Sequence, residues 1–211
     1  MASTHRHQEA EAVTSPAPQP TRGAAALADP GPVGLAAFAA TTFFLSVVNA
    51  GLLPTTVEPG VLGLALFYGG IVQVLAGMWE FAKGNTFGAL AFSSYGGFWL
   101  SFWYLLTHVN TAAMGANAGK AVGLYLLCWT IFTGYLAIAS LRTTGAITAT
   151  VTLLFLTYLA LTIGELGGTA IFGKIGGWLG IVTAIVAWYT SFAGVTNATF
   201  GKTVMPVFAR R

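Results

Sequence analysis

The side chains best able to bind something in this chain are uncharged polar groups set inside long apolar runs. Asn49 and Gln73 are amides deep in such runs, and Thr42, Tyr68 and Ser94 are hydroxyls at comparable depths. Groups of this kind can hydrogen-bond a small polar solute without holding it as firmly as a fixed charge would. They can also hydrogen-bond a neighbouring helix, a contact worth about 0.6 kcal/mol on average. The pattern therefore indicates either the lining of a solute pathway or polar pairing between helices.

Two acidic side chains lie at the ends of apolar runs. Glu80 ends the second run, and Glu165 follows the fifth. Ionisable groups near membrane depth often serve in proton coupling or gating, so both are candidates for that role. The alternative is a charge at the membrane surface, with Glu80 and Lys83 spaced as an ion pair on one helix.

Signatures of catalysis and of metal or cofactor binding are missing from the sequence. It has no nucleotide-binding loop, no Cys/His metal spacing and no nucleophile elbow, and Ser93 and Ser94 have no neighbouring base. The net charge of +3 is too small and too scattered for nucleic acid. We therefore expect no enzyme, no metal, no cofactor and no nucleic-acid partner.

The apolar runs that carry these side chains have the length of membrane-spanning helices, which need about 20 apolar residues to cross a bilayer. Charged residues make up 7% of the chain, against about 25% in soluble domains. All eight prolines fall outside the runs or at their edges, as helices require. The sequence predicts an all-α membrane protein with six transmembrane helices, at residues 33–53, 60–79, 86–106, 121–141, 145–164 and 175–195.

Short connections and two tails complete this plan. Residues 1–28 lack periodicity and are expected to form a disordered tail, residues 29–200 a transmembrane domain, and residues 201–211 a short basic tail. The last connection is expected at 165–174. With the N-terminus in the cytoplasm, seven of the nine Lys and Arg residues fall on the inner side, so both termini are predicted to be cytoplasmic. Frequent glycines within the runs predict close helix packing.

Several segments form long patterns in a fixed order. They are DPGPVGLAAFAATT (29–42), LFYGGIVQVLAGMWEFAKGNTFGALAFSSYGGFWLSF (66–102), GLYLLCWTIFT (123–133), GGWLG (176–180) and GKTVMPV (201–207). Together they resemble the acetate uptake transporter family over about residues 29–207. The family opening is N-P-A-P-L-G-L, and this chain has Asp29 in place of its Asn and Gly31 in place of its Ala.

The resemblance implies a six-helix protomer assembled as a hexameric ring in the cell membrane, with one solute path through each protomer. It implies uptake of acetate, with succinate or other short carboxylates possible, by an anion channel or a proton-coupled symporter. It also implies a narrow constriction formed by Phe38, Tyr95 and Leu154, and an effect of Ala187 on substrate size. Asn49 falls at an Asn of the family's first helix.

Physical reasoning agrees with such a constriction and leaves alternatives open. A ring of apolar side chains can dewet and block ion leak, and the Tyr95 phenol can donate to carboxylate oxygens. The helix starts near residues 30–32 and 84–86 would offer N–H groups to an anion on the cytoplasmic side. A channel for urea or short amides and a non-transporting membrane protein are the alternatives.

Overall fold

The computed structural model describes residues 27–209, so nearly all of the tail predicted at 1–28 lies outside the described residues. Every regular element in the described part is a helix, which confirms the all-α class. In chain order the elements are α1 (Gly31–Asn49), η1 (Thr55–Gly60), α2 (Val61–Gly63), η2 (Leu64–Val72), α3 (Gln73–Lys83), α4 (Thr86–His108), η3 (Thr111–Asn117), α5 (Ala118–Ser140), α6 (Gly145–Gly167) and α7 (Ala170–Phe200).

Helical rods occupy all six predicted positions, and five stretches of the described chain are long and apolar enough to cross a bilayer. α1, α6 and α7 qualify alone, whereas the continuous stretches Thr55–Lys83 and Thr111–Ser140 contain α3 and α5. α4 is as long as α6, at 23 residues. It is not among the five, since its Trp, Tyr, Ser and Gly residues lower its mean hydropathy.

Some predicted helix ends are wrong because the prediction ended an apolar run at a charged residue, whereas the helix ends where the backbone breaks. α6 continues through Glu165, and α7 is 31 residues long, so the loop expected at 165–174 is wrong. The break comes at Gly168, whose φ of +61° is a left-handed cap that glycine adopts without strain. α1, by contrast, stops short of residue 53, because Gly51 turns the chain with a φ of +78°.

The second rod contains a stretch of wider winding. η2 is a π-helix of nine residues, in which each N–H bonds to the carbonyl five residues back. Such stretches are rare and occur often at functional sites. The wider winding shifts the phase of the helix that follows, and Gln73 is the first residue of α3 to be placed by it. The apolar run LALFYGGIV gave no sign of this feature.

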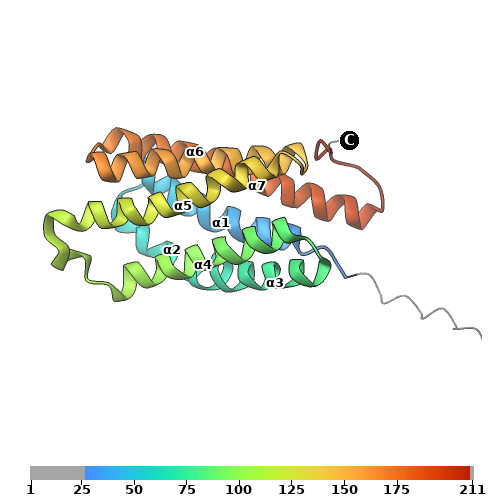
Figure 1. The fold of residues 1–211 in the computed structure, drawn as a ribbon, viewed down its shortest axis with the longest axis horizontal. Helices are drawn as coiled ribbons and strands as arrows, with labels where there is room; N and C mark the ends of the chain where they lie inside the picture. Colours follow the sequence, from blue (N-terminus) through green and yellow to red (C-terminus); the bar gives the residue numbers. More distant parts are fainter. Residues whose placement is uncertain (1–26, 210–211) are drawn as a thin grey trace, which may run out of the picture.

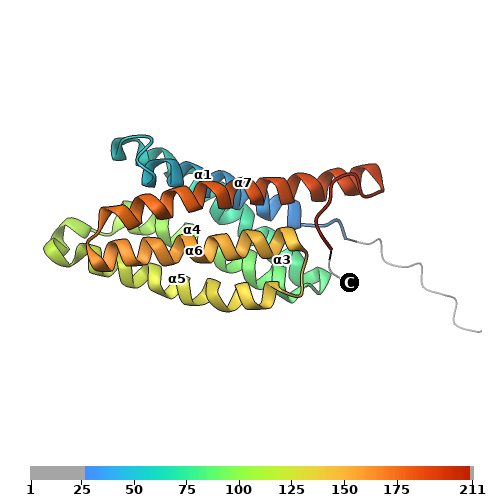
Figure 2. The same cartoon turned by 90° about the horizontal axis from the view of Figure 1, so that it is seen from above.

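In the view of Figure 1, α1 lies between α6 and α7 on one side and α3 and α4 on the other. It packs most extensively on α7, while α6 packs on both α7 and α5, and α3 pairs with α4. Seen from above in Figure 2, α1 and α7 lie along one edge of the bundle and α5 lies along the opposite edge. α4 and α5, although consecutive, have few contacts. Aromatic rings bridge them: Tyr95 lies 5.4 Å from Phe132, and Phe98 lies 5.2 Å from Trp129, between ring centroids.

Glycines let the rods approach closely. A Cβ at Gly177 of α7 would collide with the backbone of Ala50, just after α1. A Cβ at Gly77 of α3 would collide with Ser93 of α4. The close packing predicted from glycines within the apolar runs is confirmed at these crossings.

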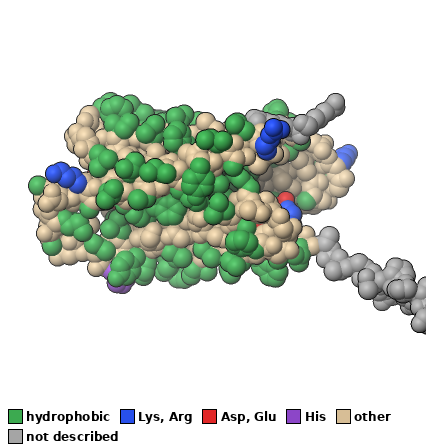
Figure 3. Space-filling view, in the orientation of Figure 1, with side chains coloured by type: hydrophobic (Ala, Val, Ile, Leu, Met, Phe, Trp, Pro, Cys, Tyr) green, Lys and Arg blue, Asp and Glu red, His purple; other side chains and the backbone are tan. Residues whose placement is uncertain are grey.

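Large apolar side chains are exposed along the flanks of the bundle. Figure 3 shows them over one flank, with Lys and Arg side chains toward the two ends. More than half of the side-chain surface is exposed at Phe67, Trp79, Ile131, Ile138 and Trp178. Water would solvate such a surface poorly, whereas the hydrocarbon core of a bilayer solvates it well.

Candidate functional site

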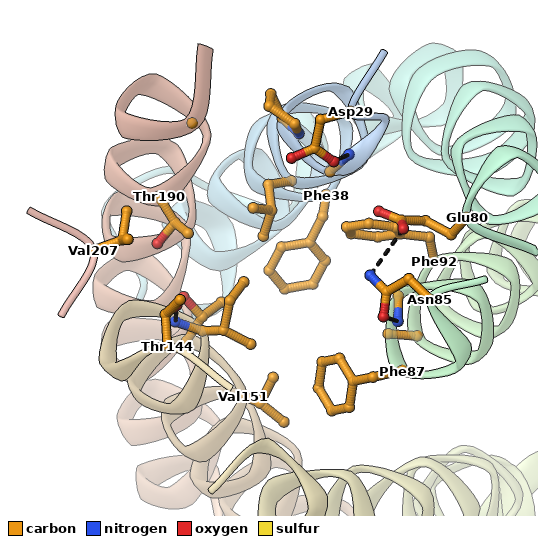
Figure 4. Close-up of a pocket in the computed structure, with 18 of the residues that line it drawn as sticks. Asp29, Phe38, Glu80, Asn85, Phe87, Phe92, Thr144, Val151, Thr190 and Val207 are labelled. Carbon is orange, nitrogen blue, oxygen red and sulfur yellow. Dashed lines mark hydrogen bonds between the residues drawn. The ribbon is translucent and has the colours of Figure 1, made fainter. Parts of the chain in front are cut away.

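A cavity of about 300 Å³ lies between α1, α3, α4, α6 and α7. Its outer lining comes from the starts of α1, α4 and α6 and from the end of α3, so it faces the end of the bundle where both described termini lie (Figure 1). We call this outer part the mouth. Figure 4 shows Glu80 and Asn85 on one wall of the cavity and Thr144, Thr190 and Val207 on the opposite wall.

The three residues implied as a constriction meet at the inner part of the cavity. Phe38 of α1, Tyr95 of α4 and Leu154 of α6 all line it, and each is only 4% exposed. The rings of Phe38 and Tyr95 lie 5.9 Å apart between centroids, in a tilted arrangement. All three belong to one core cluster, so the structure places these side chains together in an apolar setting.

The Tyr95 hydroxyl is engaged away from the cavity axis. It donates a hydrogen bond to Thr133 Oγ1 of α5 at 3.1 Å, and both side chains are buried. In this conformation the phenol proton therefore serves the contact between α4 and α5. Donation from Tyr95 to a solute stays a prediction, and it requires this hydrogen bond to be exchanged.

Gln73 is the polar group most in need of a partner. Its side chain is fully buried and lines the cavity. Neither Oε1 nor Nε2 has a hydrogen-bond partner within residues 27–209. A buried polar group left unsatisfied costs about 1–3 kcal/mol. Gln73 thus belongs to the cavity lining with its amide donor and acceptor unused, and because these atoms have almost no accessible surface, a solute reaches them only when neighbouring side chains move.

A buried carboxylate forms one wall of the mouth. Glu80 is 1% exposed, and its Oε2 accepts a hydrogen bond from Asn85 Nδ2 at 2.8 Å (Figure 4). Asn85 Oδ1 in turn accepts from the backbone N–H of Gly88 at 3.2 Å and so caps the start of α4. This pairing fixes the carboxylate of Glu80 at the cavity surface.

An ion pair lies beside that wall and corrects a prediction. Lys83 Nζ lies 2.8 Å from Asp29 Oδ1, so the partner of Lys83 is Asp29 rather than Glu80. The reason is position: Glu80 is turned into the bundle, whereas Lys83 ends α3 beside the start of α1. Both members of the ion pair line the cavity, and Lys83 is the one basic side chain in its described lining.

Both helix starts expected to attract an anion do lie at the mouth, but their own side chains occupy part of each. Asp29 Oδ1 accepts from the N–H of Gly31, and Asn85 caps α4. An anion at the mouth would therefore meet helix ends already partly neutralised. Lys83 is the basic group of the described lining, and its charge is shared with Asp29 through their ion pair.

Several predicted residues do not line this cavity: Asn49, Tyr68, Thr42, Ser94, Ala187 and Glu165. Asn49 ends α1 at the end of the bundle opposite the mouth, and Glu165 is exposed near the start of α5, beside Gly119. Ala187 is fully buried in the core cluster that also holds the three constriction residues. Thr42 is buried and its hydroxyl has no partner among the described residues. Their roles stay predictions.

Several lining residues are not among the predicted site residues. They are Asp29, Asn85, Phe87, Phe92, Thr144, Thr150, Thr190, Asn197 and Val207. Asn85 carries a helix-capping signal before Thr86, which predicts a helix start but not a site. No local sequence signal predicts that Val207, which follows the last helix, lies at a cavity lined by the first helix.

The chain is similar to known proteins in sequence and in structure. The sequence matches the GPR1/FUN34/yaaH family over residues 12–209. Succinate-acetate/proton symporter SatP of Escherichia coli K12 is 35% identical over 181 residues, which cover 86% of this chain and 95% of that protein. The structure titled as the bacterial acetate channel SatP matches with a TM-score of 0.79 at 35% identity, over 86% of this chain and 99% of that one.

Fungal relatives are longer than this chain. Acetate permease A of Emericella nidulans is 41% identical over 197 residues, which cover 85% of this chain and 65% of that protein. Two proteins of Saccharomyces cerevisiae are matched over 62% of their length. The chain thus spans less than two thirds of these relatives.

Proposed function

The chain belongs to the GPR1/FUN34/yaaH family, and we propose on that basis that it carries acetate and other short carboxylates across the cell membrane through the cavity described above. The observation that carries this proposal is the cavity itself. Its inner walls are apolar at Phe38 and Leu154, and it contains the unpartnered amide of Gln73. Lys83 supplies the one basic group of its described lining.

Acetate matches each part of this lining. Its methyl group suits the apolar ring, and its carboxylate can take up the donor of Gln73, since a buried amide gains most from a partner that it lacks. Succinate also ends in a carboxylate but has a longer chain, so the widths of the ring and of the mouth would set its transport rate. The name of the Escherichia coli relative carries both acids, which supports extending the proposal to succinate.

We propose that all six rods span the membrane, α4 included. α4 has a transmembrane length, and it forms one wall of the cavity, where aromatic and small residues serve packing better than lipid contact. Lys83, Arg142 and Lys202 lie at or just beyond helix ends on the mouth side of the bundle. Lys120 and Lys174 lie near helix starts at the opposite end of the bundle. The inner side of a membrane attracts the larger number of basic residues, so the mouth and both termini are assigned to the cytoplasm.

A ring of protomers, with six as the expected number, is part of the same proposal. Each protomer encloses its own cavity, so the path does not need a neighbour to complete it. The apolar flanks offer surface for both lipid and neighbouring protomers.

Glu80 is the better candidate for proton coupling. It is buried at the cavity wall, where Asn85 donates a hydrogen bond to it, whereas Glu165 is exposed and remote from the cavity. A carboxylate in that position can take up a proton from the cytoplasmic mouth. If no residue couples protons, the protein is an anion channel that moves acetate down its electrochemical gradient.

Flux measurements on purified protein in liposomes test the proposal. Labelled acetate uptake is measured with and without an imposed pH step, in competition with formate, propionate, succinate, urea and acetamide. We expect competition by the acids and not by the amides. Competition by urea stronger than that by succinate would favour the amide channel, for which the Gln73 amide would also be a suitable partner. Uptake no greater than in empty liposomes would refute carboxylate transport.

A further inference from the structure

After α7 the chain turns back across the mouth. Gly201 reverses its direction with a φ of +65°, and residues 201–208, which we call the C-terminal strap, run along the ends of α7 and α6. Asn197 holds the middle of the strap. Its Oδ1 accepts from the N–H groups of Val204 and Met205 at 2.7 and 2.9 Å, and its Nδ2 donates to the Met205 carbonyl at 2.8 Å.

The rest of the strap is fastened by its carbonyl groups. The Tyr189 hydroxyl donates to the Pro206 carbonyl at 2.7 Å. The first free N–H groups of α6, at Gly145 and Ala146, donate to the carbonyls of Phe208 and Val207 at 2.8 and 3.2 Å. The strap therefore supplies the capping that α6 needs at its N-terminal end.

The strap also faces the cavity. Val207 lines it, next to Thr190 and Thr144, on the wall opposite Glu80 and Asn85 (Figure 4). Val204, three residues earlier on the same strap, is 47% exposed and does not line the cavity. Val207 is thus part of the mouth that lies between the end of the bundle and the Phe38–Tyr95–Leu154 ring.

We propose that the C-terminal strap is a specificity-determining wall of the transport path, with Val207 limiting the length of the carboxylate that enters the mouth. This inference rests on the proposed carboxylate transport. A branched side chain held by flanking hydrogen bonds on both sides is a fixed obstacle rather than a flexible one. Short acids pass between Val207 and the Glu80–Asn85 wall. Longer acids are blocked by Val207 before they reach the Phe38–Tyr95–Leu154 ring. The mouth and the inner ring are thus two filters in series.

The test compares two valines of one segment. Val207→Ala and Val207→Phe are reconstituted beside Val204→Ala and Val204→Phe, and the ratio of succinate to acetate uptake is measured. Val207→Ala is expected to raise that ratio about tenfold with acetate uptake little changed, because a change of even one methylene in a hydrophobic pocket alters discrimination by about tenfold or more. Val207→Phe is expected to lower it, and both Val204 variants are expected to leave it unchanged.

A variant that leaves the lining intact separates this role from a local packing effect. Tyr189→Phe removes only the hydroxyl that fastens Pro206, so it is expected to loosen the strap and shift the ratio in the direction of Val207→Ala. An unchanged ratio in Val207→Ala and in Tyr189→Phe, with acetate uptake intact, overturns the inference while leaving carboxylate transport standing.

A readout without flux covers the case in which no carboxylate is transported. Val207→Cys and Val204→Cys are placed in a Cys128→Ser background, and their modification by a small charged thiol reagent is timed with and without acetate. Acetate is expected to slow modification at position 207 and not at 204. Equal effects at both positions count against the inference.

Discussion

The hydroxyl of Tyr95 donates to Thr133 Oγ1 across 3.1 Å and so links α4 to α5, which are also linked by hydrogen bonds of Tyr125 with Ser101 and with the Phe98 carbonyl. The same ring lies against Phe38 in the inner part of the cavity. One side chain therefore belongs both to the wall of the cavity and to the contact between these two helices. Its two functions can be separated by mutation.

Tyr95→Phe is expected to lower acetate transport and to destabilise the protein by about 1 kcal/mol, because it leaves Thr133 without its donor. Thr133→Val breaks the same hydrogen bond from the other side and frees the phenol. Liposome flux and thermal unfolding in detergent measure the two effects. If the phenol donates to the solute, Thr133→Val retains transport while Tyr95→Phe loses it. Equal losses in both variants would assign Tyr95 to helix contact alone.

Phe38→Ala is expected to widen the constriction. The ratio of succinate to acetate uptake should rise about tenfold, since a hydrophobic wall discriminates by a few kcal/mol at most. Phe43→Ala is the matched control: Phe43 lies on the same helix but packs against Trp188 and does not line the cavity. Unchanged selectivity in a well-folded Phe38→Ala protein would remove Phe38 from the constriction.

Gln73→Leu is expected to weaken acetate transport and to stabilise the folded protein. The substitution removes two unsatisfied buried polar atoms, so the free energy of unfolding should rise by about 1 kcal/mol, while the KM for acetate should increase about tenfold through loss of a hydrogen bond. Thr42→Val removes another unpartnered buried hydroxyl, outside the cavity, and should stabilise without changing KM. Stability and flux rising together in Gln73→Leu would deny the amide any contact with solute.

Glu80→Gln is expected to abolish the stimulation of acetate uptake by an inward acid gradient while leaving exchange at equal pH. Gln has nearly the same shape and can still accept from Asn85, so the change isolates the proton. Glu165→Gln, at an exposed position, should behave as the parent does. A pH response retained in Glu80→Gln would indicate coupling through another group, and the absence of a pH response in the parent protein would indicate a channel.

Lys83→Gln is expected to raise the KM for acetate about twofold to fivefold, an effect that added salt should reduce, because exposed charges at a mouth act weakly and are screened. Asp29→Asn should act in the opposite direction, since it releases the Lys83 ammonium from its ion pair. Lys174→Gln, at the far end of the bundle, is the control for net charge. A response to Lys174→Gln as large as that to Lys83→Gln would exclude a specific role for Lys83.

The rods could be read from the sequence because apolar length is a local property of the chain. It located each of the six rods, and it failed at two kinds of end: where a charge such as Glu165 or Lys174 lies within a helix that continues past it, and where α1 stops before its apolar run does. Backbone features ended the helices instead, at Gly51 and Gly168. Such helix ends depend on the backbone angle φ of a single residue, and the length of an apolar run gives no information about that angle.

The site was partly predictable. A buried amide has to find a partner, so Gln73 could be suspected from its apolar surroundings alone, and the constriction residues came through resemblance. The mouth could be predicted only in part, through the helix starts near residues 30–32 and 84–86, and the residues that face one another across it could not be predicted. Asp29 with Lys83, and Val207 with Glu80, are separated by 54 and 127 positions along the chain, and only the packing of the bundle brings them together.

The π-helix at Leu64–Val72 separates two quantities that are tied together in an ordinary helix, the length of a rod and the direction its far half faces. Deleting one residue there would return one turn from i→i+5 to i→i+4 hydrogen bonding, so the loss is taken up within that turn and the far half keeps its direction. The same deletion in an ordinary α-helix would turn everything beyond it by about 100°. Gln73 and Glu80 would therefore stay at the cavity after a one-residue deletion in this stretch, and homologous chains whose second rods differ in length by one residue are expected to differ here.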